Sequence, residues 1–260
     1  MHASAARDAR LAALREEIGA IERSPRAGGG RGVLPFGIDE VDSRLARGGL
    51  VPALHEAAAA SPRAGDDAAA SLFLAALAAR FSRREGQKDQ APGQVLWAIA
   101  RRDLFAPGLA QAGLTPDRLI YAECRNDAEV LAVMEEGVRH GGLAAVIGEA
   151  GRADMAATRR LQLAAEDKGI AALLLRRWKK AGADPLAMPS AAVTRWRIAC
   201  ASSAPLPFPG VGRARWHVEL ARQRGGPGHE WILEAPDAKA RLALPARSGD
   251  RPDRAGSLAA

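Results

Sequence analysis

Four residues near position 60 have the types and spacing that could handle a phosphate group. A phosphate-binding P-loop follows the pattern G-x-x-x-x-G-K-[ST], and this spacing puts Ala60 at the first glycine and Gly65 at the second. Asp66 and Asp67 then stand at the lysine and hydroxyl positions, so two carboxylates would face the phosphates. A like-charge contact of about 4 Å costs on the order of 4 kcal/mol at an effective dielectric constant of about 20. We therefore expect no ATP and no Mg²⁺ as cofactors.

The same aspartates, together with Glu149, allow a second interpretation. Carboxylates at neighbouring strand ends can hold Mg²⁺, which would make them a metal site. The alternative, which we favour, is that Asp66 and Asp67 complement the dipole of a helix that begins there. We expect Glu149 to form an internal ion pair with Arg101 or Arg176 rather than to act as a base. We assign no catalytic residue and no metal ligand.

Other catalytic patterns are missing from the sequence. It contains neither H-E-x-x-H nor G-x-S-x-G, and its histidines lack metal-ligand spacing. Cys124 has no evident His–acid context that would make it a nucleophile. With Cys200 as the only other cysteine, a disulfide framework and a four-thiolate zinc site are excluded.

A run of cations beside a tryptophan is the strongest candidate for nucleic-acid contact. The run consists of Arg176, Arg177, Trp178, Lys179 and Lys180. Four cations can neutralise phosphates and an indole can stack on a base, which is the usual combination for single-stranded DNA. The alternative is a solvated loop with Trp178 packed on the core.

The elements that position these residues follow from the alternation of apolar runs with amphipathic stretches. We expect strands over 50–59, 95–100, 119–121, 143–148 and 170–175, and helices over 39–45, 66–84, 103–112, 126–141 and 153–168. Such alternation predicts an α/β fold with a mainly parallel central sheet flanked by helices. Three further strands, over 193–200, 215–222 and 230–234, are expected to add to the sheet as antiparallel neighbours. We expect Trp196 and Trp216 in these strands to be core residues, and the arginines beside them to be exposed.

Three parts follow one another along the chain. Residues 1–32 combine an amphipathic helix over 4–23 with a glycine-rich linker, 33–245 are expected to form the core domain, and 246–260 a disordered tail. The helix over 4–23 has a narrow apolar stripe. It is expected either to dock in a groove of a partner or to fold back on its own core.

Composition and charge narrow the class of protein. The 260 residues include 59 alanines and 32 arginines, and the net charge is +7. Residues 151–260 contain 19 basic and 10 acidic side chains, so the basic excess lies in the second part of the chain. Because an alanine and arginine excess is typical of GC-rich genomes, the charge alone is weak evidence for nucleic acid. No run of 18 apolar residues and no secretory signal is evident, so we expect a cytoplasmic protein without membrane contact.

The order of these segments resembles the core of RecA-like recombinases over about 33–235. Residues 36–50, with the sequence FGIDEVDSRLARGGL, resemble the segment that leads into the RecA P-loop. Segments 95–107, 141–149, 170–177 and 214–234 match later RecA segments in the same order. By this resemblance the catalytic glutamate position holds Arg101, or Arg102 if the register shifts by one. The Walker B aspartate position holds Glu149, and the position of the glutamine that senses the γ-phosphate holds Arg176.

A RecA-like core in which all these nucleotide-handling positions have changed resembles the ImuA family of damage-inducible mutagenesis proteins. The resemblance implies a non-catalytic accessory role in SOS-induced, error-prone translesion DNA synthesis. The implied partners are an ImuB-like protein, related to Y-family polymerases, and an error-prone C-family polymerase. RecA, single-stranded DNA and a second copy of the chain stay open as further partners. The alternative function is a DNA-dependent ATPase, or a regulator of recombinase filaments, with a degenerate P-loop.

Overall fold

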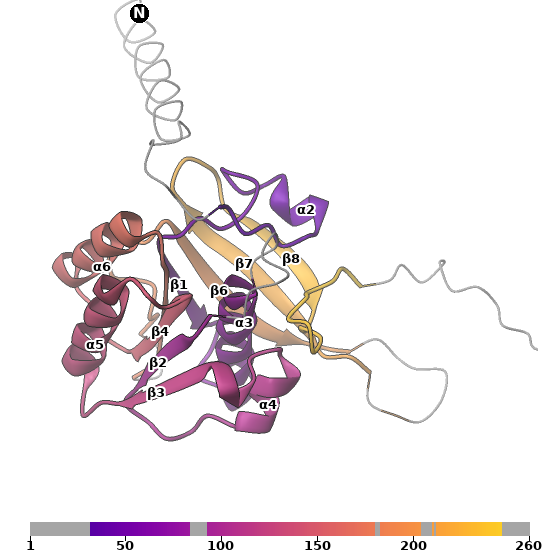
Figure 1. Ribbon diagram of the computed structural model, residues 1–260. Coiled ribbons are helices and arrows are strands. Elements are labelled where there is room, and N and C mark those ends of the chain that lie inside the picture. Colours follow the sequence, from indigo (N-terminus) through magenta and orange to yellow (C-terminus); the bar gives the residue numbers. More distant parts are fainter. Residues whose placement is uncertain (1–31, 84–92, 180–182, 204–209, 211, 246–260) are drawn as a thin grey trace, which may run out of the picture.

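The computed structural model describes residues 32–83, 93–179, 183–203, 210 and 212–245 (Figure 1). The helix expected over 4–23 and the tail expected over 246–260 lie outside the described residues, as does Lys180. The division of the chain into these parts therefore stays a prediction.

One eight-stranded sheet, in the order β3-β2-β4-β5-β1-β6-β7-β8, organises the described residues. Its strands are β1 (Leu54–Ala59), β2 (Val95–Ile99), β3 (Leu119–Glu123), β4 (Ala145–Ala150), β5 (Ala171–Arg176), β6 (Thr194–Ala201), β7 (Arg215–Gln223) and β8 (His229–Glu234). Neighbours from β3 to β6 are parallel, whereas β7 and β8 add antiparallel pairs at one end. The predicted fold class, a mainly parallel sheet with antiparallel C-terminal strands, is confirmed.

Helices cover both faces of this sheet. They are α2 (Asp39–Asp42), α3 (Ala64–Ser82), α4 (Ala106–Gln111), α5 (Asp127–His140) and α6 (Met155–Lys168), with a 3₁₀ turn η1 (Pro116–Arg118). The long, alanine-rich α3 packs on one face, and α5 and α6 pack side by side on the other (Figure 1). Asn126 and Asp154 cap the N-termini of α5 and α6 with their side chains, and left-handed Gly141 and Gly169 end the two helices.

The core accordingly has two layers. On the α3 side Trp97, Trp196 and Phe73 are fully buried, and the rings of Phe73 and Trp196 lie 5.6 Å apart. On the α5 and α6 side the sheet packs against Met134 and its neighbours. A side chain at Gly148 of β4 would collide with Met134, so glycine lets α5 approach the strand closely.

Several boundaries differ from those expected, and two of the differences affect the site. Helix α3 begins at Ala64, so Gly65 belongs to its first turn instead of a preceding loop. Strand β4 continues to Ala150, which leaves Glu149 inside the strand. Trp196 and Trp216 are buried as expected, but Arg195 is buried too, because it has a carboxylate partner inside the protein.

Candidate functional site

The turn between β1 and α3 is closed by side chains. Asp66 is buried, and its carboxylate accepts hydrogen bonds from the Ser61 hydroxyl at 2.5 Å and from the Cys200 backbone N–H at 2.7 Å. The Ala60 N–H donates to the carbonyl of Ile198, which ties the turn to β6. These contacts hold the turn against β6.

Beside this turn, three carboxylates surround Arg177. The guanidinium donates from Nη2 to Glu149 Oε2 at 2.7 Å and from Nε to the same oxygen at 3.0 Å. It also contacts Asp67, at the start of α3, and lies 3.3 Å from Asp103, which follows β2. We call Asp67, Asp103, Glu149 and Arg177 the Arg177 network. It joins the ends of two central strands to the start of α3.

The Arg177 network lies largely inside the protein. The side chain of Arg177 is 9% exposed and that of Glu149 2%, and the Trp97 indole N–H donates to the second Glu149 oxygen at 2.8 Å. Burial raises the pKa of the Glu149 carboxyl, and the charge of Arg177 counteracts that rise. Burial also opposes the charge on Arg177, but Glu149 and Asp67 outweigh it and raise the pKa of the guanidinium. The chain thus supplies its own cation to these carboxylates.

The internal ion pair expected for Glu149 is present, but its partner is neither Arg101 nor Arg176. Arg101 is largely exposed and pairs with Asp103, and its guanidinium lies 3.9 Å from Asp67. Arg102 pairs with Glu123 on the surface. Within the described residues, no three His, Cys, Asp or Glu side chains are grouped so that they could hold a metal ion.

Arg176 belongs to a second buried network on the opposite face of the sheet. Its Nη1 lies 3.2 Å from Glu56 Oε1, and Arg195 Nε lies 2.7 Å from Glu56 Oε2. The Ser190 hydroxyl donates to Glu56 at 2.8 Å. Successive residues of an extended strand face opposite sides of the sheet, which separates Arg176 from Arg177. We call Glu56, Arg176, Ser190 and Arg195 the Glu56 network.

Sequence reasoning missed Glu56. The available signal was a lone acidic side chain within the apolar strand over 50–59, because a carboxylate that is fully buried needs a cation or several donors. The sequence does not reveal that β1 lies between β5 and β6, which brings both arginines to it.

The four DNA-contact candidates that the structure describes separate into buried and exposed groups. The side chains of Arg176 and Arg177 are 1% and 9% exposed, and both guanidinium groups are already paired with carboxylates. Trp178 is half-buried, packs against the core and donates its indole N–H to the Ala59 carbonyl at 2.8 Å. Lys179 is about half exposed and lies 2.7 Å from Asp127. DNA contact stays a prediction, and among the described candidates the exposed cation is Lys179.

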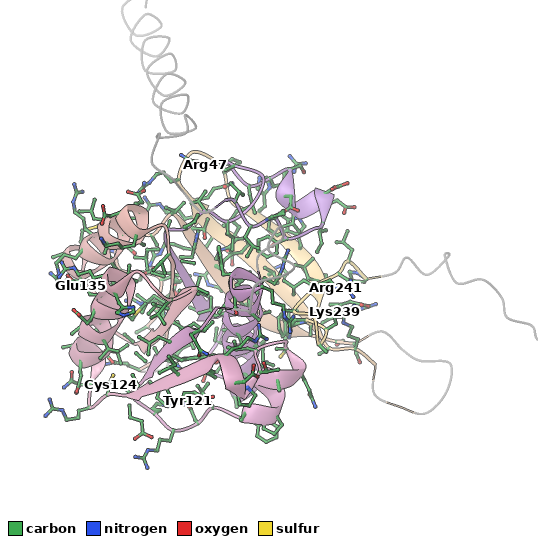
Figure 2. All side chains as sticks on the ribbon, in the orientation of Figure 1. Arg47, Tyr121, Cys124, Glu135, Lys239 and Arg241 are labelled. Carbon is green, nitrogen blue, oxygen red and sulfur yellow. The ribbon has the colours of Figure 1, made fainter. Side chains whose placement is uncertain are left out.

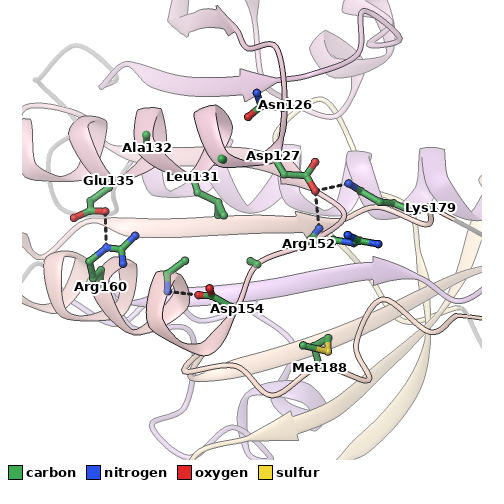
Figure 3. A pocket seen from close by; sticks show the side chains of 13 residues that line it. Asn126, Asp127, Leu131, Ala132, Glu135, Arg152, Asp154, Arg160, Lys179 and Met188 are labelled. Atoms are coloured by element: carbon green, nitrogen blue, oxygen red, sulfur yellow. Dashed lines mark hydrogen bonds and ion pairs between the residues drawn. The ribbon is translucent and has the colours of Figure 1, made fainter.

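A pocket of about 800 Å³ opens beside Lys179, between the N-terminal halves of α5 and α6 (Figure 3). Its charged lining is largely paired, since Lys179 meets Asp127 and Arg160 lies 3.1 Å from Glu135. Leu131, Met188 and several alanines supply apolar surface. The pocket is therefore balanced in charge and mixed in polarity.

These features define a class: an α/β domain with a mainly parallel sheet and antiparallel C-terminal strands, in which arginines of the chain pair with the buried carboxylates of the sheet. The chain belongs to the ImuA family. It is 40% identical over 212 residues to "Protein ImuA" of two strains of Caulobacter vibrioides, NA1000 / CB15N and ATCC 19089 / CIP 103742 / CB 15. The match covers 79% of this chain and 84% of the relative. No protein-family model matches the chain.

One further property concerns membranes. Within the part of the chain that the structure describes, no helix combines the length and apolar character needed to cross a bilayer.

Proposed function

We propose that the protein is a non-catalytic accessory factor of SOS-induced, error-prone translesion DNA synthesis. It would act in the cytoplasm as an adaptor between an ImuB-like protein and an error-prone C-family polymerase. Membership of the ImuA family supports the biological role.

The Arg177 network is the observation that carries the non-catalytic part of the proposal. A phosphoryl-transfer site needs cations that are free to meet phosphates, and carboxylates that are free to hold Mg²⁺. Here Glu149 and Asp67 contact the guanidinium of Arg177, which is itself buried. A nucleotide with its metal ion would have to displace this pair and leave buried charges without partners, at a cost of several kcal/mol.

The closed turn before α3 supports the same conclusion from a different direction. Asp66 is bonded to Ser61 and to the backbone of Cys200, so its carboxylate holds the turn against β6. Opening the turn for a triphosphate would break both bonds and bring the γ-phosphate towards two carboxylates.

Nucleotide binding tests the non-catalytic part directly. We expect a fluorescent ATP analogue with Mg²⁺ to show no saturable binding to the full chain up to millimolar concentration, with or without single-stranded DNA. Saturable binding, or ATP hydrolysis stimulated by DNA, would support the alternative of a DNA-dependent ATPase.

Reconstitution tests the adaptor role. We expect an ImuB-like partner and an error-prone C-family polymerase to elute together in size-exclusion chromatography more completely when this protein is added. Equal co-elution with and without the protein would contradict the adaptor role while leaving the nucleotide result unaffected.

A further inference from the structure

Strand β3 (Leu119–Glu123) forms an open edge of the sheet. Its hydrogen-bonded neighbour is β2, and α5 packs over β2 and β4 rather than over β3 (Figure 1). Ile120 is 45% and Tyr121 44% exposed, although both are large apolar side chains within a strand. They lie on opposite faces of β3, so among the described residues each face of the sheet leaves a large side chain about half exposed at this edge, where Figure 2 labels Tyr121.

The main-chain groups of alternate β3 residues point away from the sheet. The Cys124 N–H donates to the Ile99 carbonyl of β2, and the alternation along a strand then turns the N–H and C=O of Leu119, Tyr121 and Glu123 outward. Among the described residues, no main-chain group pairs with this outer side. The strand has no proline, lysine or bulge, which are among the usual protections of an exposed edge, and its charged residue, Glu123, pairs with Arg102.

The opposite edge of the sheet is different. The β8 residue Glu234 donates its N–H to the Ala243 carbonyl, so the chain after β8 covers part of that edge. Among the described residues, the β8 edge is therefore partly covered by main chain, whereas the β3 edge is not.

We propose that β3 pairs with β3 of a second copy of the chain, antiparallel and centred on Tyr121. This register pairs all five residues of the strand, with Leu119 opposite Glu123 of the second copy and Tyr121 opposite Tyr121. The three outward-facing pairs would then form about six main-chain hydrogen bonds. On the other face Ile120 would lie against Ala122 of the second copy, a large side chain against a small one.

Charge complementarity favours a second copy as the occupant of this edge. Asp117 lies in η1 just before β3 and Arg125 just after β3, so antiparallel pairing brings these oppositely charged ends of the two copies near each other, and two-fold symmetry repeats the pair. The side chains of Asp117 and Arg125 are exposed. Within one copy, Arg125 forms an ion pair with Glu129, whose side chain is 33% exposed. Because the contact consists of one short strand and its flanks, the dimer should be weak and dependent on concentration.

Sedimentation equilibrium of the full chain over a wide concentration range tests the proposal. We expect a reversible monomer–dimer equilibrium that Tyr121→Pro weakens at least about tenfold, because proline removes a central outward donor without touching the β2 side. A wild-type chain that stays monomeric up to about 1 mM, or a Tyr121→Pro variant that folds and dimerises normally, would overturn the proposal.

A charge-swap pair tests the register and does not depend on proline being tolerated. Asp117→Arg and Arg125→Asp each place like charges near each other twice in the dimer, so each should weaken dimerisation severalfold at low salt. The double variant restores opposite charges and should recover most of the wild-type affinity. No weakening in the single variants, or no recovery in the double variant, would show that the chains do not meet in this register.

Discussion

Glu149 of β4 and Arg177, which directly follows β5, come from neighbouring parallel strands, and Arg177 Nη2 lies 2.7 Å from Glu149 Oε2. The register of β4 and β5 places Ala150 beside Arg176, so the two charged residues flank that pair on the α3 face. Strand pairing therefore brings their side chains together at the carboxyl ends of two central strands. This explains how the charge of Arg177 can be held inside the protein beside the start of α3.

Removing the cation should therefore destabilise the fold. Arg177→Met leaves Glu149 buried without its counter-ion, and we expect the free energy of unfolding in urea to fall by about 3–5 kcal/mol. Arg101→Met is the matched control, because that arginine is 57% exposed and its loss should cost less than about 1 kcal/mol. Adding Glu149→Gln to Arg177→Met should recover part of the loss. Equal effects of the two arginine variants would contradict the structural role of the pair.

The Glu56 network should respond in the same way. Glu56→Ala removes the acceptor shared by Arg176 and Arg195, both buried, and should lower the free energy of unfolding by about 3–5 kcal/mol. Glu56→Gln keeps the shape of the side chain and one of its two acceptor oxygens, so it should cost less. Urea midpoints measure both, and a Gln variant as unstable as the Ala variant would show that the negative charge of Glu56, rather than its shape or a single acceptor oxygen, is what stabilises the network.

The sequence predicts the sheet much better than the partners of its charged residues. Continuous apolar runs such as those of β4 and β5 indicate parallel strands covered on both faces, and helix caps such as Asn126 and Gly141 indicate boundaries. Which face of the sheet a charged residue occupies at a strand end depends on the alternation of side chains along the strand. An error of one residue in the predicted position of the strand therefore exchanges the faces assigned to Arg176 and Arg177.

The Glu56 network shows a second reason why the sequence does not predict the partners of charged residues. A carboxylate inside an apolar strand indicates a buried partner, but β1 receives its two arginines from β5 and β6, far along the chain. The order of strands in the sheet determines these neighbours, and the spacing of apolar residues within one segment does not reveal that order.

His55 should make stability depend on pH. It is fully buried, accepts from the Thr194 hydroxyl and donates Nε2–H to Val51, and burial lowers its pKa from 6.5 to about 4. The unfolded chain then binds a proton at higher pH than the folded chain, so stability is lost as pH falls from about 6.5 to about 4. This contribution is about 3 kcal/mol. Urea midpoints between pH 4 and 7 should show a smaller pH slope for His55→Gln, and an unchanged slope would contradict the assignment.

Lys179 is the described residue at which the DNA-contact prediction can be tested without disturbing the interior. Arg176 and Arg177 are buried in ion pairs, whereas Lys179 is about half exposed at the rim of the pocket. We expect Lys179→Glu to weaken binding of single-stranded DNA and to reduce the salt dependence of the affinity by about one unit of slope, as for the loss of one phosphate contact. The matched control is Lys168→Glu, a lysine of similar exposure at the far end of α6. Fluorescence anisotropy at several salt concentrations measures both, and identical changes in the two variants would indicate a general charge effect with no contact at Lys179.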